Sequence, residues 1–362
     1  MKKFFKGILW ILGGFVLVVL GLTIFIWINS PGKTAPFTGA DGKPIAGSIA
    51  AVEKISLGGV DQYLIIRGAN QNNPVMLFLH GGPGSPEYAF MKEFNPYLEN
   101  DFVMVYWEQR GAGKSWSKNI PPESMTLEQM ISDTRELSEY LATRFGKEKI
   151  FVMGHSWGSF LGILTAYQYP ELFHAYFGIG QVANQYRAEK VSFEWVKEQA
   201  RKNNDNKAIE TLESLKFPDL QADTDAWKAF LMPERNFVMR YGGGVTRELK
   251  SMVPLVKIVF TTREYTFSDK MNFMKGSMFS LEHLWLDVVN TNLFNTIYSM
   301  QVPVYIFQGV FDYQTPYVVA REFFEQLKAP QKEFFTFEKA AHSPLFEEVE
   351  RFNGLINDLQ KL

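Results

Sequence analysis

The segment that most constrains the fold is the pentapeptide Gly-His-Ser-Trp-Gly at residues 154–158. It follows the apolar run 149–153, which is typical of a buried strand, and it leads into residues 157–168, which have a helical pattern. A serine between such elements, with a glycine two residues away on each side, indicates a nucleophile elbow. The turn is so tight that larger side chains at the two glycine positions would clash, and the Ser156 hydroxyl is expected to stand clear of the sheet.

The composition excludes several kinds of site. The chain has 362 residues, a net charge of −2 at pH 7 and no cysteine. Disulfides, thiolate catalysis, cysteine zinc sites and a lipid-modified cysteine are therefore excluded. The nearly balanced charge gives no electrostatic basis for binding nucleic acid. No His-x-x-x-His pattern or acidic cluster with metal-ligand spacing occurs, so we expect no metal and no cofactor.

An uncharged apolar segment occupies residues 7–28. As a helix its roughly 22 residues would span about 33 Å, enough for the hydrocarbon core of a bilayer. Because Lys2, Lys3 and Lys6 precede it, the N-terminus is expected in the cytoplasm and the body outside the cell membrane. The alternative is a cleaved signal peptide and a secreted body, but the apolar part is long and no clean cleavage site follows. We therefore predict a stub and an uncleaved anchor at residues 1–30.

The remaining chain alternates strands and helices, with one interruption. Residues 31–48 are rich in Pro, Gly, Thr and Ser and are typical of a linker. Short apolar strands and helices alternate in residues 49–182 and again in 296–362, whereas residues 183–295 contain only helical patterns and are predicted to form an inserted cap. Such alternation predicts an α/β fold with a mostly parallel sheet, covered on both faces, and ligands beyond the carboxyl ends of the strands.

Local patterns predict the individual elements. Gly58 and Gly59 separate the first two strands, which indicates an antiparallel hairpin. Thr126 and Gln129 have the pattern of a capping box at the start of a long helix. The expected strands are 49–55, 62–67, 75–79, 102–106, 149–153, 175–179, 302–307 and 333–337, and the expected helices outside the cap are 126–145, 157–168, 316–328 and 344–361.

A serine hydroxyl is a weak nucleophile, so it needs a base, and the base needs an orienting acid. In chains with this type of elbow the order is Ser, then Asp or Glu, then His. His342 lies in the loop after the last strand, where the base belongs. The other four histidines are less suitable. His80 precedes the serine and His155 adjoins it. His174 lies at the start of a strand and His283 in the predicted cap.

Asp312 is the predicted acid. It follows the strand 302–307, and Gly309 between them permits a turn. Asp287 is the alternative, but it falls in the cap and has the pattern of a solvated helix charge. The predicted roles are that Ser156 attacks, His342 transfers the proton, and Asp312 holds His342 and stabilises its cation.

A glycine-rich loop, His-Gly-Gly-Pro-Gly at residues 80–84, directly follows the strand 75–79. An oxyanion needs preorganised N–H donors, and glycine allows the backbone to approach a substrate closely. We expect the N–H groups of Gly82 and Trp157 to form the oxyanion hole. Gly81 is expected to border the substrate.

These motifs resemble the proline iminopeptidase (prolyl aminopeptidase) branch of the α/β-hydrolase superfamily. The matching segments are 80–84, 109–115 (QRGAGKS) and 154–159, and the resemblance covers residues 50–360. Glu108 stands where the family usually has aspartate before Gln-Arg-Gly. The resemblance implies the α/β-hydrolase fold and hydrolysis of an N-terminal residue, typically proline, from a peptide. The branch also contains esterases and amidases.

Hydrolysis at a free N-terminus requires a cap carboxylate, because a buried ammonium must be paired. Glu189 and Glu194 follow soonest after the strand that leads into the cap, and we favour them as substrate-binding residues. The other candidates in the cap are Glu198, Glu210, Glu234, Glu248 and Glu264.

We therefore predict a membrane-anchored serine aminopeptidase that releases proline or a small apolar residue through an acyl-enzyme. The alternative is a carboxylesterase or lipase-like hydrolase with the same triad. A non-catalytic binding module is disfavoured by the complete set of Ser156, Asp312 and His342, and epoxide hydrolase or dehalogenase chemistry by the serine at the nucleophile position. The expected partners are a peptide or small acyl substrate and the membrane, through residues 7–28; the oligomeric state stays open.

Overall fold

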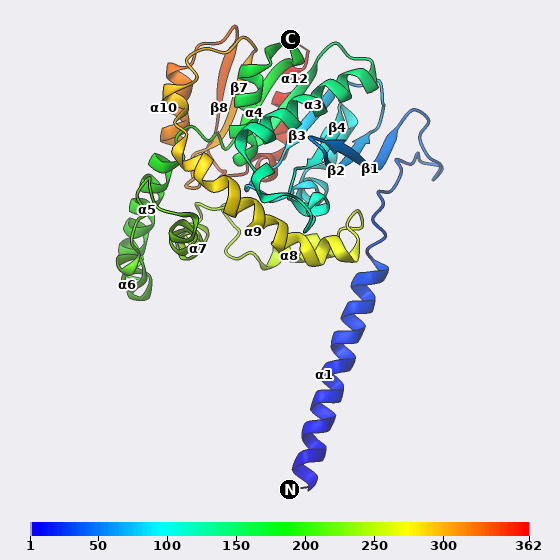
Figure 1. Ribbon diagram of the computed structural model, residues 1–362, viewed down its shortest axis with the longest axis vertical. Helices are drawn as coiled ribbons and strands as arrows, with labels where there is room; N and C mark the ends of the chain where they lie inside the picture. Colours follow the sequence, from blue (N-terminus) through cyan, green and yellow to red (C-terminus); the bar gives the residue numbers. More distant parts are fainter. Residues whose placement is uncertain (1, 362) are drawn as a thin grey trace.

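An eight-stranded sheet forms the centre of the body in a computed structural model, which describes residues 2–361 (Figure 1). The strand order is β1-β2-β4-β3-β5-β6-β7-β8. The pairs β1–β2 and β2–β4 are antiparallel and all other neighbours are parallel, which confirms the mostly parallel sheet. The strands are β1 (Ile49–Leu57), β2 (Val60–Gly68), β3 (Val75–Leu79), β4 (Val103–Glu108), β5 (Ile150–His155), β6 (Phe173–Ile179), β7 (Val304–Gly309) and β8 (Lys332–Phe337).

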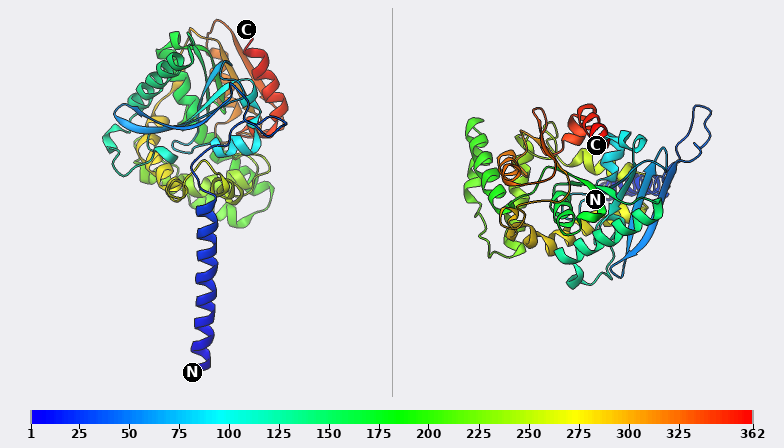
Figure 2. Two further views of the ribbon diagram at one scale, coloured as in Figure 1. Left: turned by 90° about the vertical axis from the view of Figure 1, so that its right-hand side faces the viewer. Right: turned by 90° about the horizontal axis from the view of Figure 1, so that it is seen from above.

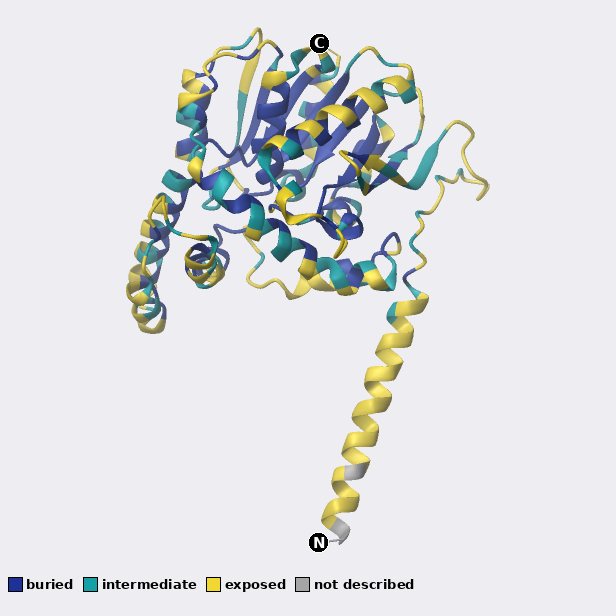
Figure 3. Ribbon diagram, in the orientation of Figure 1, coloured by how far each residue is buried: buried dark blue, intermediate teal, exposed yellow. Residues whose placement is uncertain are grey.

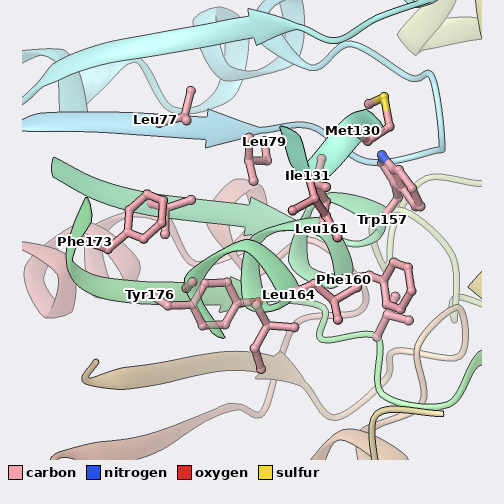
Figure 4. Close-up of a cluster of buried hydrophobic side chains, with 14 of the residues drawn as sticks. Leu77, Leu79, Met130, Ile131, Trp157, Phe160, Leu161, Leu164, Phe173 and Tyr176 are labelled. Atoms are coloured by element: carbon pink, nitrogen blue, oxygen red, sulfur yellow. The ribbon is translucent and has the colours of Figure 1, made fainter. Parts of the chain in front are cut away.

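Helices cover both faces of the sheet. One hydrophobic cluster joins the sheet to α3, α4 and α10, and a second joins it to α2 and α12. In Figure 4, Tyr176 of β6 lies beside Leu164 of α4 in the first cluster. The helices are α1 (Lys2–Ile28), α2 (Tyr88–Phe94), α3 (Leu127–Phe145), α4 (Trp157–Gln168), α5 (Gln185–Lys202), α6 (Asn206–Ser214), α7 (Thr224–Arg240), α8 (Val253–Thr261), α9 (Phe267–Asn290), α10 (Tyr317–Gln326), α11 (Pro344–Glu347) and α12 (Val349–Leu359), with short 3-10 helices at Pro96–Asn100, Gly113–Ser115, Pro122–Ser124, Pro170–Leu172 and Leu293–Asn295.

The central strands are the most apolar ones. Every residue of β3, β4 and β5 is buried, because these parallel strands carry helices on both faces. At the edges of the sheet, β1 and β8 are partly exposed. The buried strands therefore hold the loops at their carboxyl ends in fixed positions.

The start of α3 differs in one respect from the expectation. Thr126 caps the helix by accepting the N–H of Gln129 at 3.2 Å. The predicted capping box is nevertheless wrong, because the side chain of Gln129 donates to Asp133 at 2.7 Å instead of turning back to Thr126. A complete capping box occurs at the start of α9, between Thr266 and Asp269.

The last expected helix, 344–361, is two helices. Glu348 has φ −124° and ψ 55°, outside the helical region, and it separates α11 from α12. The break lets α11 follow the His342 loop while α12 packs on the sheet through Phe352 and Ile356.

Between β6 and β7 the chain forms only helices, α5 to α9, with a hydrophobic core of their own. In that core Phe193 of α5 packs edge-on against Phe230 of α7, and Trp227 of α7 packs against Trp285 of α9. This helical unit, which we call the cap, lies on the side of the body from which α1 projects (Figures 1 and 2).

The first helix projects from the body as a single exposed rod (Figure 3). Within Phe4–Ile28 an 18-residue window has a mean hydropathy of 2.7, and none of that window is buried in the body. By length and composition the helix can cross a membrane, a criterion that a signal sequence also meets.

The segment after β4 joins the sheet to the cap. The carboxylate of Glu108 accepts the Lys114 N–H at 3.0 Å and the Tyr265 hydroxyl at 2.8 Å. Burial raises the pKa of Glu108 to about 7. Lys114 Nζ contacts Asp269 at 2.6 Å and the carbonyl of Glu264 at 3.0 Å. The Glu108 carboxylate thus supports the position of α9.

Arg110 forms a fully buried ion pair with Asp133 of α3, both side chains being 0% exposed. Its Nε lies 2.8 Å from Oδ2 and its Nη2 lies 3.0 Å from Oδ1. Nη2 also donates to the carbonyls of Leu57 and Gly58, at 3.0 and 3.1 Å. The pair therefore fastens the turn between β1 and β2 to α3.

Replacing Asp133 by Ala should lower the free energy of unfolding by about 3–5 kcal/mol, because Arg110 stays buried without its partner. The measurement is the urea unfolding curve. The control is Glu139→Ala on the same helix. It removes an ion pair at the surface, in which the side chain of Arg135 is 45% exposed and that of Glu139 is 50% exposed. This control should cost about 0.5 kcal/mol or less. Equal losses in the two variants would contradict the prediction.

Candidate active site

Ser156 occupies a strained turn between β5 and α4. Its φ of 56° and ψ of −122° lie outside the regions that residues other than glycine commonly adopt. The turn can close because its neighbours lack side chains: a Cβ on Gly154 would collide with the carbonyl of Gly158, and one on Gly158 would collide with the carbonyl of Leu79. This backbone has the geometry of a nucleophile elbow.

The loops after β7 and β8 carry a buried His–Asp pair. His342 Nδ1 lies 2.8 Å from Asp312 Oδ2. The carboxylate of Asp312 also accepts the side-chain amide of Gln308, the hydroxyl and N–H of Thr315, and the N–H of Gln314, at 2.7 to 2.9 Å. These donors satisfy a buried negative charge and fix the imidazole through Nδ1, which leaves Nε2 for another partner.

Ser156 and His342 both lie against the end of β6. The Ser156 N–H donates to the carbonyl of Ile179, the last residue of β6, at 2.9 Å. The next residue, Gly180, has φ 55°, and a Cβ on it would lie 2.8 Å from His342 Cε1. Among residues 2–361 the Ser156 hydroxyl has no hydrogen-bond partner within 3.5 Å. Contacts between a nucleophile and its base often tighten only when substrate binds.

The glycine-rich loop after β3 lies against the serine. A Cβ on Gly81 would be 3.1 Å from Ser156 Cβ, so the loop approaches the serine closely. The Gly81 N–H is used by Glu87 at 3.2 Å, whereas Gly82 lines the same cavity as Ser156 and Trp157. Trp157 is the first residue of α4, so its N–H has no acceptor within the helix. Both expected oxyanion donors therefore border the cavity beside the serine.

Two buried side chains brace this loop. His80 Nε2 accepts the N–H of Gln109 at 3.3 Å, so its proton lies on Nδ1 and is donated to the carbonyl of Gly81 at 2.8 Å. Burial lowers the pKa of His80 to about 4, which keeps the ring neutral. The side chain of Gln109 accepts the Trp157 indole N–H at 2.8 Å and donates to the carbonyl of His80 at 3.1 Å. Gln109 thereby links the loop to the start of α4.

His155 connects three segments around the serine. Its Nδ1 lies 2.7 Å from Glu87 Oε1, and its Nε2 lies 3.1 Å from the carbonyl of His342. The second oxygen of Glu87 accepts the Gly81 N–H. Burial lowers the pKa of His155, but Glu87 and the carbonyl of His342 raise it more, so the net direction is upward. The buried pair of Glu87 and His155 thus joins the glycine-rich loop, the elbow and the His342 loop.

A cavity of about 160 Å³ lies between the elbow and the cap. The polar side chains among its lining residues are Ser156, Gln185, Arg235, Gln314 and Thr315. The rest of its wall is apolar and comes mainly from α7 and α9: Val182, Leu231, Met232, Leu281, Trp285 and Val288.

A buried charged cluster of Glu189, Glu234 and Arg235 adjoins this cavity. Arg235 pairs with Glu189 and, at 2.6 Å, with Glu234, and both carboxylates are buried. Burial raises the pKa of Glu234 to about 7, against the opposing effect of Arg235. Among the described residues, Glu189 Oε2 and Gln185 Oε1 have no hydrogen-bond partner. Arg235 and Gln185 are part of the cavity wall, and the two carboxylates contact Arg235 without being among the lining residues.

The structure places the other candidate residues away from the cavity. Glu194 is exposed and pairs with Lys197 at 2.8 Å, so it is not brought together with Glu189. Asp287 accepts the N–H of Leu127 at 3.1 Å and stabilises the start of α3. Within residues 2–361 no group of His, Asp and Glu is clustered closely enough to hold a metal ion. His174, Glu198, Glu210 and Glu248 are exposed, Glu264 pairs with Lys92, and His283 contacts the carbonyl of Phe279.

Comparison with known proteins identifies the family. A family model described as the alpha/beta hydrolase fold matches residues 74–349. The chain belongs to the α/β-hydrolase family. The probable aminopeptidase YbaC of Bacillus subtilis is 32% identical over 315 residues, which cover 86% of this hydrolase and 96% of the relative. A proline iminopeptidase of Clostridium botulinum is 24% identical over 302 residues, 82% of this hydrolase and 92% of that protein. These relatives confirm the proline iminopeptidase branch.

Solved structures share the fold of this α/β hydrolase. The proline iminopeptidase of Mycobacterium smegmatis superimposes with a TM-score of 0.61 at 15% identity, over 85% of this chain and 97% of that one. An epoxide hydrolase mutant from Bacillus megaterium gives 0.54 at 17% identity, over 86% and 100%. Two different chemistries thus occur on one fold, so the fold alone does not identify the reaction.

Three residues around the site were not identified from the sequence. Glu87 follows the glycine-rich loop by three positions, and its acidic side chain among Gly, Pro and apolar residues was the available signal. Gln109 was noticed only as part of a motif. Arg235 lies in an amphipathic helix far along the chain from Glu189, so no local pattern connected them.

Replacing Glu87 by Gln should lower the pKa of His155, because the substitution removes the negative charge that raises it and leaves burial, which lowers it. A histidine with a raised pKa in the folded state stabilises the fold fully below its unfolded pKa of about 6.5. This contribution is lost as the pH rises through the folded pKa. The stability difference between wild type and variant should therefore be largest below about pH 6.5.

NMR titration of labelled histidines and urea unfolding at several pH values measure the two effects. Glu93→Gln, at an exposed position of α2, the helix that Glu87 precedes, is the matched control and should change neither. An unchanged titration of His155 in Glu87→Gln would show that the carboxylate does not set its pKa.

Proposed function

We propose that this α/β hydrolase is a membrane-anchored serine aminopeptidase that releases proline or another small apolar residue from the N-terminus of peptides. The observation that carries the proposal is the arrangement of the strained Ser156 after β5 and the buried pair of Asp312 after β7 and His342 after β8. Its aminopeptidase-named relatives support the substrate class.

In the proposed mechanism, Ser156 Oγ attacks the carbonyl carbon of the first residue while His342 Nε2 takes its proton. Asp312 holds the imidazolium through Nδ1. The N–H groups of Gly82 and Trp157 stabilise the oxyanion, assisted by the N-terminus of α4. His342 then protonates the leaving amine, which leaves an acyl-enzyme. Water, deprotonated by His342, releases the amino acid and restores Ser156.

The charged cluster supports recognition of a free amino group. Two carboxylates, Glu189 and Glu234, face one guanidinium, so with both ionised the cluster carries one excess negative charge. A buried charge needs a partner, and an α-ammonium in the cavity would supply one. Because the pKa of Glu234 is raised to about 7 by burial, part of this group is protonated at neutral pH. A bound cation would favour its ionised form.

The size and wall of the cavity support a small apolar side chain. About 160 Å³ holds a residue of the size of proline, and most side chains around it are aliphatic or aromatic. The proposed location is the outer face of the cell membrane, with the N-terminus in the cytoplasm, because the apolar part of α1 is long enough to span and the lysines of α1 lie at its start. A secreted body released from a signal peptide is the alternative.

Replacing Ser156 by Ala should reduce kcat by about 10³-fold or more, since the attacking oxygen is removed. The assay is steady-state hydrolysis of a prolyl arylamide by the full-length protein in detergent. Ser117→Ala, at an exposed loop position, should leave the rate unchanged. Retention of the rate in the Ser156 variant would rule out the serine mechanism.

The substrate class can be tested with three compounds: a prolyl arylamide with a free amine, its N-blocked analogue, and a short-chain aryl ester. An aminopeptidase should turn over the free amine and not the blocked compound, because only an ammonium can pair with the cluster. Strong ester hydrolysis without arylamide turnover would instead support the carboxylesterase alternative, which the apolar wall of the cavity also suits.

Replacing Glu234 or Glu189 by Gln should raise KM for the free-amine arylamide by about 10-fold or more, the effect of losing a charge-assisted hydrogen bond. The same variants should change KM for a neutral aryl ester by less than about twofold, because the ester makes no such contact. Glu194→Gln, which removes an exposed glutamate on the same helix as Glu189, is the control. Equal effects on both substrates would indicate a structural role only.

A further inference from the structure

Apolar side chains are exposed along α8 and the first turns of α9. Val253 is 73% exposed and Met274 is 60% exposed, and Met252, Val256 and Met271 are each close to half exposed. Val253 and Val256 are three residues apart in α8, as are Met271 and Met274 in α9, so each pair lies on one face of its helix. We call these five residues the α8–α9 patch.

The turn between α8 and α9, which separates the two halves of the patch, adjoins the end of the N-terminal helix. The N–H of Gly32 donates to the carbonyl of Arg263 at 3.0 Å, in the turn between α8 and α9. Pro31 forms a bridge with Thr266, and Lys270 Nζ donates to the carbonyl of Asn29 at 3.1 Å. Figures 1 and 2 show the same arrangement, with α8 running across the direction of α1 at the edge of the body nearest to it.

These contacts set the height of the patch relative to a bilayer. The apolar part of α1, Phe4–Ile28, has 25 residues. At 1.5 Å per residue it is about 37 Å long, against about 30 Å of hydrocarbon. If α1 spans the membrane, Ile28 lies at the interface, and the turn between α8 and α9, bonded to Asn29 and Gly32, lies within the headgroup layer.

The exposed charges around the patch suit an anionic surface. The two buried or half-buried acids of this region, Glu264 and Asp269, are paired with Lys92 and Lys114. The exposed charged residues of segment 247–275 are five basic residues and one acidic residue: Arg247, Lys250, Lys257, Arg263 and Lys275, and Glu248. This local excess of positive charge contrasts with the net charge of −2 for the whole chain.

We propose that the α8–α9 patch rests in the headgroup region of the bilayer that α1 crosses. The cap is then held against the membrane by three elements: the span, the apolar side chains and the surrounding basic residues. Apolar faces of such interfacial helices lie about 5–10 Å into the boundary between headgroups and acyl chains. The inference rests on the proposed anchor, and it adds a second, independent contact between the enzyme and lipid.

Single-cysteine labelling can test this directly, because the natural chain has no cysteine. The full-length variants Val253→Cys and Met274→Cys are labelled with a polarity-sensitive fluorophore and reconstituted into vesicles of neutral or partly anionic phospholipid. Lipids with a nitroxide near the headgroup should quench both labels about twofold or more, as expected for the depth of an interfacial helix. Anionic lipid should increase the quenching, and high salt should reduce that increase.

Two control positions make the outcomes separable. Val318→Cys lies on α10, is 45% exposed and should report water, whereas Leu17→Cys lies within α1 and should be quenched by nitroxides deep in the acyl chains. Quenching at 17 with water-like signals at 253 and 274 would overturn the patch and leave the anchor standing. A water-like label at 17 would overturn the anchor and the patch together. An apolar signal at 253 without lipid quenching would mean that another protein covers the patch, which also overturns the proposal.

Discussion

The tight turn at Ser156 is the constraint on which the rest of the site depends. Its unusual backbone angles place α4 so close to the sheet that Gly158 touches the carbonyl of Leu79 at the end of β3. That approach brings the first N–H of α4 beside the glycine-rich loop that continues β3. A larger residue at position 154 or 158 would separate the helix from this loop. The strain at one residue is therefore maintained by the packing of two buried strands and a helix.

Around this turn, a few buried polar side chains hold loops that come from distant parts of the sequence. Glu87 and His155 connect the glycine-rich loop with the carbonyl of His342, and Gln109 connects the same loop with Trp157. Each group is satisfied by several partners, so removing one leaves others buried and unpaired. Gln109, from the second of the three motifs, bonds to both of the others, and Glu87 connects the first with the third.

The parts of the fold that depend on local patterns could be predicted from the sequence. Strand–helix alternation and the tight turn identified the sheet, the elbow and the ends of β7 and β8, where Asp312 and His342 lie. The hydrogen-bond and ion-pair partners of individual side chains could not be predicted, because tertiary packing determines them. The side chain of Gln129 could accept the N–H of Thr126 or donate to Asp133, and it donates to Asp133, which is buried with Arg110. Glu194 and Glu234 both lie on cap helices with similar patterns, and only tertiary packing exposes one and buries the other.

The long helix α9 has a consequence for any soluble form of this hydrolase. Its first turns bind the segment that follows α1, through Thr266 and Lys270, and its last turns supply Trp285 and Val288 to the cavity. From Lys270 to Trp285 a continuous helix covers about 22 Å at 1.5 Å per residue. The segment after α1 and the cavity wall therefore contact opposite ends of one continuous helix. A cut within residues 29–32 would remove contacts from the first turns of the same helix that carries Trp285 and Val288, so removing α1 changes the support of a helix that lines the cavity.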